Sequence, residues 1–469
     1  MRKNWFGWLI TIGIGIALCL CPRPAGITGE GWTLLAIFIA TIVGSIVQPL
    51  PSSAMVLVGV MATVVTGALK PADALKGYSD PIVWLVLAAF FLACGMIKTG
   101  LGRRIALNFV RKIGRKTLGL GYALVSTDFV LAAMIPSNGA RNGGVILPIA
   151  LGVCETYDSR PEDGTEGRIG SFIINLLYQC DVVICATFLT GQASNLIIAD
   201  LAAKNAGVHL SYIGWLTAAI VPSVISLLLV PQIIYRLFPP QIKETPEASD
   251  FAAAELEKMG PMSGAEKTMM LVIVSVVGLW VTKDYLHTID TSIAAIIGIC
   301  VLLAADVLDW KDLMGEKNAW SVFIWYGGLV NMAAALGETG ITKIFADSVG
   351  SLTVGVPLPL AVAILLLTYF YSHYFFASIT AHVLAMFLPF LAVMATLGAP
   401  VGLSVLMLAY FSNLNAGLTH FGTTPGPIYF GTGYVAQRTW WMTGLITSII
   451  NIAIWTCSGL IWWKILGWW

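Results

Sequence analysis

The sequence predicts an all-α polytopic membrane protein with about eleven transmembrane helices, two re-entrant hairpins and an inverted-topology repeat. Two observations predict this fold class. Hydrophobic residues make up 57% of the 469 residues and charged residues only 11%, whereas soluble proteins carry roughly a quarter charged residues. Apolar segments long enough to cross a bilayer also recur along the whole chain. The net charge of +1 argues against nucleic acid as a partner, since the sequence has no basic face beyond the clusters that flank the membrane.

The first half of the chain, 1–238, begins with four full spans and continues with shorter or interrupted segments. The full spans are expected at 5–21, 31–48, 54–69 and 81–97. A cluster of Lys and Arg then predicts a surface helix at 98–117, whose cations lie among the lipid headgroups on the cytoplasmic side. The remaining elements of this half are a hairpin at 118–154, a broken helix at 168–205 and a span at 211–238.

The longest hydrophilic stretch, 239–267, is expected to be a solvated cytoplasmic linker, part of it helical, because it carries a run of carboxylates. It divides the chain into two halves, and the second half, 268–469, repeats the element order of the first. The elements of the second half are spans at 268–286, 290–308 and 319–337, a surface helix at 338–352, a hairpin at 357–397, a broken helix at 402–435 and a span at 440–465.

Two polar interruptions have the character of hairpin tips. Residues 136–141, with the sequence PSNGAR, lie between apolar arms that are too short to be spans, and residues 377–382, ASITAH, follow at an offset of 241. Polar backbone at membrane depth is tolerated only where it is buried in protein or lines a watery cavity. Paired breaks in the two halves of a transporter indicate its binding site.

The repeat and the distribution of cations together predict the orientation in the membrane. The breaks at Gly191 and Gly422 align at an offset of 231, which supports the repeat. The excess of Lys and Arg on one side places the amino terminus in the cytoplasm and the carboxyl terminus outside, so that one hairpin enters from each face. No cleavable leader is expected, and a bacterial inner (cytoplasmic) membrane is the expected location.

The hairpin tips are the expected binding site for an anion. A half-helix that starts at a tip presents unpaired N–H groups and a partial positive charge of ~0.5 e, which favours a carboxylate. Small polar side chains and glycine at the tips, with oxygens of the second broken helix, complete the expected substrate site. These substrate-binding residues are Ser137, Asn138, Gly139, Arg141, Ser378, Thr380, His382, Gly422, Thr423 and Thr424. The residues that could bind a small cation are Ser137, Asn138, Gly191, Ser378, Gly422 and Thr423.

Arg141 and His382 occupy equivalent places, four residues after Ser137 and Ser378. One interpretation is that both side chains face an anionic ligand between the tips, where Arg could bind a carboxylate bidentately. The alternative for Arg141 is a structural ion pair with Asp128 or Asp181. His382 could respond to pH or act as a neutral donor.

At these residues the sequence resembles the divalent anion:sodium symporter family, and in particular its branch of citrate–succinate and 2-oxoglutarate–malate antiporters. The resemblance covers nearly the whole chain and is carried by 100–107, 136–141, 375–382 and 424–427. It implies a homodimer in which each protomer has a scaffold part and a transport part that moves like an elevator. It also implies a Ser-Asn-Thr motif at each tip that binds substrate and sodium.

The sequence departs from that motif twice, because Gly139 replaces the first Thr and Ile379 replaces the second Asn. Fewer oxygens then remain for sodium, so sodium is a doubtful coupling ion, and no metal or other cofactor is expected. The expected function is sodium-independent exchange of carboxylates such as malate, succinate, fumarate, 2-oxoglutarate or citrate. The reason is that an empty site with fixed cations is costly to carry through the membrane. Sodium-coupled dicarboxylate symport and an anion channel are the alternatives, and no set of catalytic residues is present.

Overall fold

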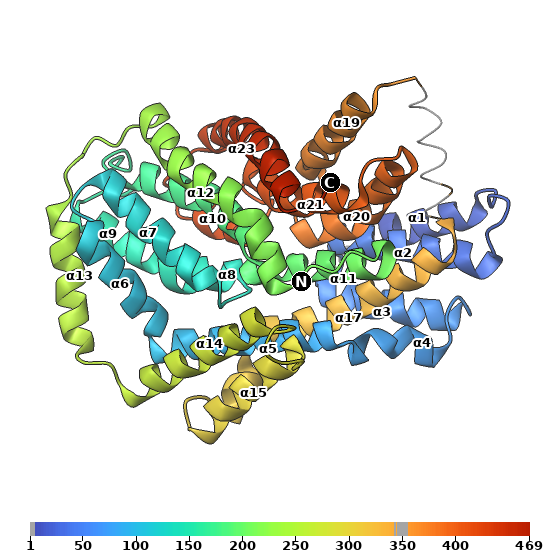
Figure 1. Ribbon diagram of the computed structural model, residues 1–469, viewed down its shortest axis with the longest axis horizontal. Coiled ribbons are helices and arrows are strands. Elements are labelled where there is room, and N and C mark those ends of the chain that lie inside the picture. Colours follow the sequence, from blue (N-terminus) through green and yellow to red (C-terminus); the bar gives the residue numbers. More distant parts are fainter. Residues whose placement is uncertain (1–4, 342–343, 345–354) are drawn as a thin grey trace. The chain divides into compact units, whose positions relative to one another are not determined.

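The computed structural model describes residues 5–341, 344 and 355–469, which form helices joined by turns (Figure 1). The prediction of an all-helical membrane protein is confirmed. Within the described ranges, ten helices are long and apolar enough to cross a membrane, and four shorter apolar helices accompany them. Most of the second expected surface helix, 338–352, lies outside the described residues.

The chain forms two compact units, and each unit takes segments from both halves of the sequence. Unit 1 consists of Met1–Leu87, Leu196–Leu210 and Lys317–Ala409, and unit 2 of Ala88–Asn195, Ser211–Glu316 and Tyr410–Trp469. The chain passes from one unit to the other within α5 (Pro81–Thr99), α11 (Ala193–Ala206) and α21 (Val401–Leu414). The linker that separates the repeats is therefore not a boundary between compact units.

Unit 1 contains the amino-terminal helices and the second hairpin. Its elements are α1 (Trp5–Leu20), α2 (Gly29–Val47), α3 (Ser52–Val65), α4 (Pro71–Leu75), η1 (Lys76–Ser79), α17 (Lys317–Glu338), α19 (Leu358–Tyr371), η4 (Ser372–Phe375) and α20 (Ile379–Thr396). Small residues permit close helix packing here. A Cβ on Gly328 of α17 would come within 2.6 Å of Val56 on α3.

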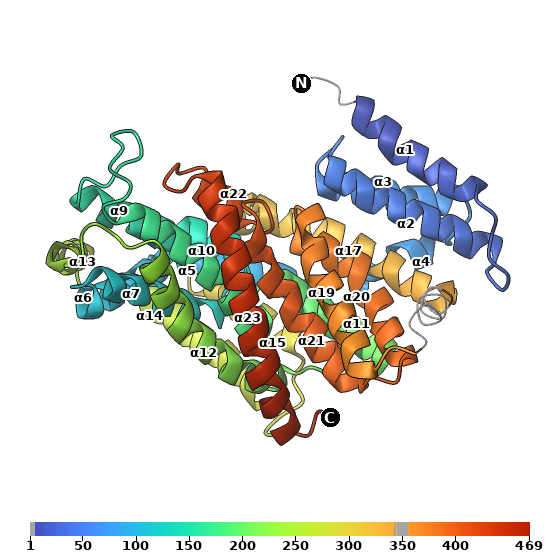
Figure 2. The same cartoon turned by 90° about the horizontal axis from the view of Figure 1, so that it is seen from above.

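Unit 2 contains the first hairpin and is organised around a buried central helix, α10 (Figure 2). Its elements are α6 (Leu101–Ile113), α7 (Thr117–Ala132), α8 (Asn138–Arg141), η2 (Asn142–Ile146), α9 (Leu147–Thr156), α10 (Gly170–Thr187), η3 (Leu189–Gly191), α12 (Tyr212–Leu237), α13 (Pro246–Met259), α14 (Gly264–Thr282), α15 (Thr291–Ala304), α16 (Trp310–Gly315), η5 (Asn415–Leu418), α22 (Pro425–Phe430) and α23 (Gln437–Ile465). Helix α10 packs against α7, α12, η5 and α23, and 94% of its residues are buried. A helix that is apolar and buried all round in this way belongs to the core of its unit.

Three of the expected full spans are shorter helices with identifiable stops. Helices α1, α3 and α15 have 16, 14 and 14 residues. The chain leaves α3 at Gly67, which has φ 76°, and leaves α15 at Asp306, which has φ 53°. A positive φ cannot continue a right-handed helix, and Pro22 follows directly after α1.

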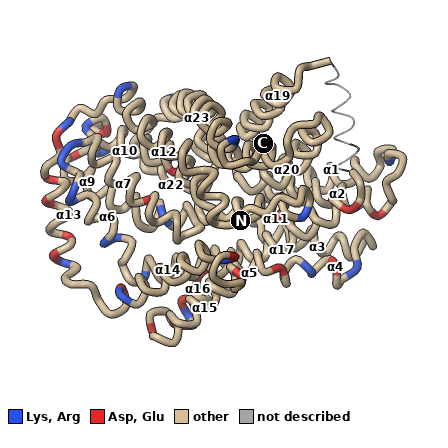
Figure 3. Tube along the Cα trace, viewed as in Figure 1, with Lys and Arg blue, Asp and Glu red and all other residues tan. Residues whose placement is uncertain are grey.

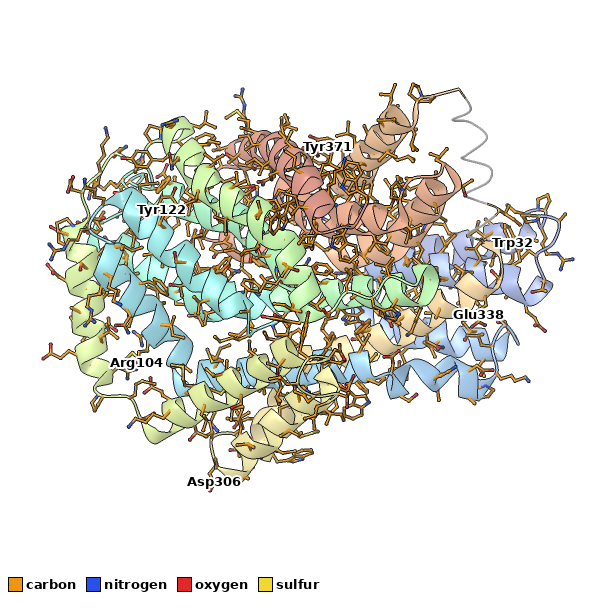
Figure 4. All side chains as sticks on the ribbon, viewed as in Figure 1. Trp32, Arg104, Tyr122, Asp306, Glu338 and Tyr371 are labelled. Atoms are coloured by element: carbon orange, nitrogen blue, oxygen red, sulfur yellow. The ribbon has the colours of Figure 1, made fainter. Side chains whose placement is uncertain are left out.

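The hydrophilic stretch 239–267, expected to be a solvated linker that is helical in part, belongs to unit 2 and packs on it through one face of its helix. Its helix α13 lies along α6 and α9, where charged residues gather at one end of the unit (Figure 3). Arg103 binds Glu255 at 2.5 Å, and Arg104, labelled in Figure 4, binds Glu266 at 2.6 Å. Ion pairs with α6 thus bind two carboxylates of this stretch, whereas Glu244, Glu247, Asp250 and Glu257 are exposed.

A hydrogen bond also fixes the amino end of α13. The hydroxyl of Tyr157, at the end of α9, donates to Glu247 at 2.7 Å and accepts from the backbone N–H of Ala248 at 3.1 Å. The bond from Tyr157 lowers the pKa of Glu247, and burial raises the pKa of Tyr157. We call the segment α13 the strap, because it joins α6 to α9 across the base of the first hairpin.

Candidate functional site

Ser137 and Asn138 start the helix that leaves the first hairpin tip. The Ser137 Oγ accepts a hydrogen bond from the Ala140 N–H at 3.2 Å, and the Asn138 Oδ1 accepts from the Gly139 N–H at 3.0 Å. These are N-cap interactions, which account for Ser and Asn at this position. The helix continues through η2, a π-helical turn of a kind often found at functional sites. The Asn138 Nδ2 donates to Thr423 at 2.9 Å and so joins the tip to the second broken helix.

Arg141 lies at the centre of the site and is completely buried. Its side chain has five N–H donors, and protein atoms accept from all three of its nitrogens. The acceptors are Asp128 at 2.8 Å, Asp181 at 3.2 Å, the carbonyl oxygens of Ile135 at 2.8 Å and Gly191 at 2.6 Å, and the Cys185 Sγ at 3.6 Å. Arg141 therefore ties together the tip, its arm α7, the central helix α10 and the first break.

The two carboxylates favour the structural interpretation of Arg141 over direct contact with an anion. Asp128 and Asp181 are 3% and 0% exposed in their side chains, and both bind the same guanidinium. With the two carboxylates, two carbonyl oxygens and the Cys185 Sγ as acceptors, the five donors of the guanidinium are all used, and none is left for a substrate carboxylate. Contact between Arg141 and a substrate stays a prediction, and it would require one of these bonds to break.

Asp181 extends the network to the helix after the second break. Asn142 donates to Asp181 at 2.8 Å, and the Tyr429 hydroxyl donates to the Asn142 Oδ1 at 2.6 Å. Asn138 adds a longer contact to Asp181 at 3.4 Å. Three side chains of the first tip thus converge on one buried carboxylate of α10.

The first broken helix has its break where the sequence predicts it, at η3 between α10 and α11. A Cβ on Gly191 would lie 2.4 Å from the carbonyl oxygen of Cys185, so only glycine fits this turn. The turn exposes the Gly191 carbonyl, which was a predicted cation ligand, and Arg141 donates to it.

The second broken helix unwinds earlier than expected, at η5, and the non-helical turn with Gly422, Thr423 and Thr424 follows. Thr424 packs directly on the first tip. A Cβ on Gly139 would come within 2.7 Å of the Thr424 methyl group. This contact accounts for glycine at the position where the family resemblance leads us to expect Thr.

Three amide side chains that the sequence analysis did not identify join the two broken helices. The Asn413 Nδ2 donates to the Asn195 Oδ1 at 2.9 Å, and the Gln192 Nε2 donates to the Asn413 Oδ1. Asn195 in turn donates to the carbonyl oxygens of Cys185 and Phe188, at 2.8 and 2.9 Å. We call Gln192, Asn195 and Asn413 the amide clamp. The only sequence signal for it is the occurrence of amides inside apolar segments.

The second tip belongs to unit 1 and is described by itself. The Ser378 Oγ accepts from the Ala381 N–H at 3.5 Å and caps α20, as Ser137 caps the first tip, and Thr380, the second residue of α20, is half-buried. The His382 Nε2 lies 3.0 Å from the carbonyl oxygen of Tyr369 and 3.0 Å from the Ser372 hydroxyl. A carbonyl only accepts, so Nε2 carries a proton. The buried Nδ1 has no acceptor for a second proton among the described residues, so the geometry favours the neutral-donor interpretation of His382.

The structure therefore collects one group of the predicted residues in unit 2. That group is Ser137, Asn138, Gly139, Arg141, Gly191, Gly422, Thr423 and Thr424. Ser378, Thr380 and His382 lie together in unit 1. Across the described parts of the chain, no group of three His, Cys, Asp or Glu side chains could hold a metal ion.

Comparison with known proteins identifies the family. Residues 2–469 match the family described as the sodium:sulfate symporter transmembrane region. The chain belongs to this family. One relative is YflS of Bacillus subtilis (strain 168), named for malate transport, with 44% identity over 98% of this chain and 96% of that protein. Another is dicarboxylate transporter 1, chloroplastic, of Arabidopsis thaliana, with 44% identity over 98% and 83%. The L-tartrate/succinate antiporter of Shigella sonnei (strain Ss046) is 32% identical over 98% of each chain.

The sodium:sulfate symporter family consists of membrane transport proteins, so this chain is a multi-pass transporter and not an enzyme. The expected resemblance to the divalent anion:sodium symporters is confirmed over the whole chain. A solved structure, that of the Alcanivorax borkumensis YdaH transporter, aligns with a TM-score of 0.48 at 13% identity over 99% of this chain and 98% of that chain.

Proposed function

We propose that this transporter exchanges dicarboxylates, and tricarboxylates such as citrate, across the inner membrane of a bacterium without coupling to sodium. Relatives over nearly the full length are named for malate and dicarboxylate transport, and one is named as an antiporter. Two capped hairpin tips with small polar side chains suit a carboxylate, because the N–H groups at each helix start favour a negative charge.

The hydrogen bond from Arg141 to the Gly191 carbonyl is the main support for transport that does not depend on sodium. A sodium ion at the first tip would need oxygen ligands, and the carbonyl of this break is the natural one. Here that oxygen, together with the Ile135 carbonyl, already accepts from the guanidinium at 2.6 and 2.8 Å. A second cation at the same oxygens would be repelled by the fixed one.

The sequence suggested that fixed cations make the empty site costly to move, but the charge of Arg141 is not free in the structure. Asp128 and Asp181 compensate Arg141, so this cluster offers no free positive charge to an arriving dianion. Binding at each tip then depends on neutral groups, Ser137 and Asn138 in unit 2 and Ser378 and Thr380 in unit 1, and on the helix N-terminus there. A bound carboxylate compensates the partial positive charge of such a helix start, which makes the loaded tip the cheaper one to move.

The resemblance supplies the remaining parts of the proposal. Each protomer of a homodimer moves its transport part like an elevator and presents the two tips to alternate sides of the membrane. The amino terminus lies in the cytoplasm and the carboxyl terminus outside, as the distribution of Lys and Arg indicates.

Counterflow in proteoliposomes tests the proposal. Vesicles loaded with unlabelled succinate are expected to accumulate labelled succinate or malate from outside, with equal rates in sodium and choline buffers. Vesicles without internal dicarboxylate are expected to take up little. Uptake into empty vesicles that needs an inward sodium gradient would contradict exchange. Uptake into empty vesicles without any gradient and without stimulation from the opposite side would identify a channel.

Sodium-coupled symport is the second candidate, favoured by the presence of Ser137, Asn138 and Thr423 at one place. The side-chain oxygens of these three residues could bind a cation away from the Arg141 guanidinium. Ser137→Ala separates the two functions. In a symporter this change is expected to weaken the dependence on sodium concentration, whereas in an exchanger it alters the apparent affinity for dicarboxylate alone.

A further inference from the structure

The cations of the first surface helix fall into two groups with different partners. Arg103 and Arg104, at the amino end of α6, are bound by Glu255 of the strap and by Glu266 of α14. The cations at the other end of α6 and in the turn after it are exposed. Within the part of the chain that the structure describes, none of these lies within 4.0 Å of a carboxylate oxygen.

Backbone pairing brings a further lysine to the exposed group. The Thr117 N–H donates to the Lys243 carbonyl at 3.0 Å, and the Thr245 N–H donates to the Arg115 carbonyl at 2.7 Å. Lys116 and Glu244 form an antiparallel bridge between the same two segments. We call the resulting surface the basic patch, and its cations are Arg111, Lys112, Arg115, Lys116 and Lys243.

The patch carries an excess of positive charge that no ion pair of the described residues balances. Glu244, which the backbone bridge places beside Lys116, forms no ion pair with any of the five cations within the described residues. Other cations of the unit do have carboxylate partners, as Arg160 has in Glu155 at 2.6 Å and Lys258 has in Glu255 at 2.7 Å. Like charges that lie close together are unfavourable unless an anion binds them.

The position of the patch indicates the kind of anion. Thr117 directly follows the patch and begins α7, an apolar helix and the first arm of the hairpin. Ile113 is 44% exposed within the patch, so an apolar side chain stands beside the cations. Phosphate groups above an acyl layer match this combination, whereas a soluble anion would gain nothing from Ile113.

We propose that the basic patch is a binding surface for the headgroups of anionic phospholipids, and that it anchors the base of the first hairpin at the membrane boundary. The strap and α14 make this binding local. Glu255 of the strap neutralises Arg103 and Glu266 of α14 neutralises Arg104, so only the end of α6 next to α7 is available to lipid phosphates. The surface is independent of the proposed transport function, since it requires no substrate.

Binding of phosphatidylglycerol to the purified protein in neutral detergent tests the proposal. The patch variant carries Lys112→Gln, Arg115→Gln and Lys116→Gln. The control variant carries Arg23→Gln, Lys70→Gln and Lys76→Gln, three exposed cations of unit 1 with the same charge change. Native mass spectrometry counts the bound lipids, and the midpoint of thermal unfolding reports their stabilising effect, with phosphatidylcholine as the neutral comparison.

The wild-type protein and the control are expected to bind phosphatidylglycerol in preference to phosphatidylcholine and to lose that preference at high salt. The patch variant is expected to bind it about a hundredfold more weakly, since each cation near an anionic surface contributes about 1 kcal/mol. If the triple variant does not fold, the single changes still test the proposal, each with about fivefold weaker binding. Equal binding by the patch variant and the wild type, or an equal loss in the control, overturns the proposal. So does slower dicarboxylate uptake with unchanged lipid binding, which would assign the patch to substrate attraction.

Discussion

Arg141 donates hydrogen bonds to the Gly191 carbonyl at 2.6 Å and to Asp128 at 2.8 Å, and so joins a break in one helix to an arm of the hairpin. The same residue was expected from the sequence to face the ligand. In the structure it binds protein groups around the candidate site. Arg141 thereby fixes the tip and the break relative to each other. The hydrogen bond from Asn138 to Thr423 also fixes the position of Ser137 and Asn138 beside the second turn.

Arg141→Ala is expected to reduce stability as well as transport. Removing the guanidinium leaves two buried carboxylates without their cation, which costs about 3–5 kcal/mol. Arg141→Lys keeps the charge but loses the fork that reaches two carbonyls and two carboxylates, so an intermediate loss is expected. Thermal unfolding in detergent and counterflow measure the two effects. If Arg141→Ala has a normal unfolding midpoint but no transport, Arg141 contacts the substrate directly and has no structural role.

Gly139→Ala is expected to lower both stability and the rate of exchange, because its Cβ would meet the Thr424 methyl group at 2.7 Å. Crowding of this kind costs about 1–3 kcal/mol. Thr424→Ala removes that methyl group, so the double variant is expected to recover part of the loss. Gly278→Ala, where nothing lies within 4 Å, is the matched control. No recovery in the double variant would show that Gly139 is needed for its backbone or for direct substrate contact.

The break at Gly191 and the two hairpin tips could be predicted from the sequence, because their chemistry is local. Gly191 stands where a Cβ would collide with the Cys185 carbonyl, and Ser137 and Ser378 are ordinary N-cap residues. Glycine, serine and asparagine inside an apolar run are a visible signal of such turns. Asp128 and Asp181 could likewise be named as partners for Arg141, since buried cations need carboxylates.

Long-range packing could not be predicted in the same way. Asn195 and Asn413 pair across 218 residues, and no motif distinguishes these amides from others such as Asn451. The packing of the strap could not be predicted from its charges either. A run of carboxylates is most often solvated. Only the structure reveals that Arg103 and Arg104 of α6 bind Glu255 in the strap and Glu266 just after it.

The amide clamp is expected to contribute measurable coupling between the broken helices. Asn413→Leu leaves the Asn195 Oδ1 and the Gln192 Nε2 without the partner that they have in Asn413, which costs about 1–3 kcal/mol. In a cycle with Asn195→Leu, the double variant is expected to lose less than the sum of the single changes. Asn451→Leu is the control, because the Oδ1 of that buried amide has no hydrogen-bond partner among the described residues. Strict additivity of unfolding free energies in the cycle would mean that the amides do not act as a unit.

The strap is expected to detach from α6 and α9 in acid. The hydrogen bond from Tyr157 of α9 lowers the pKa of Glu247 below that of the unfolded chain. The pKa of Glu255 is lowered by a hydrogen bond from Lys258, within the strap itself, and by the charge of Arg103 on α6. The bonds to ionised carboxylates therefore contribute stability above an unfolded pKa of about 4.3 and lose it as the pH falls through the lower folded values. Spin labels on exposed positions of α6 and α13 report the separation. We expect a constant distance from neutral pH down to about 4.3, and a broad, longer distribution below it.

Glu247→Gln gives the neutral form of one carboxylate at every pH, so it is expected to loosen the amino end of the strap already at neutral pH. Tyr157→Phe removes the donor and should have the same local effect, while the carboxyl end stays bound through Arg103 and Glu255 at 2.5 Å. Should the label distance stay fixed in acid and in both variants, apolar contacts of the buried Ala248 and Ala252 would have to hold the strap without its carboxylates.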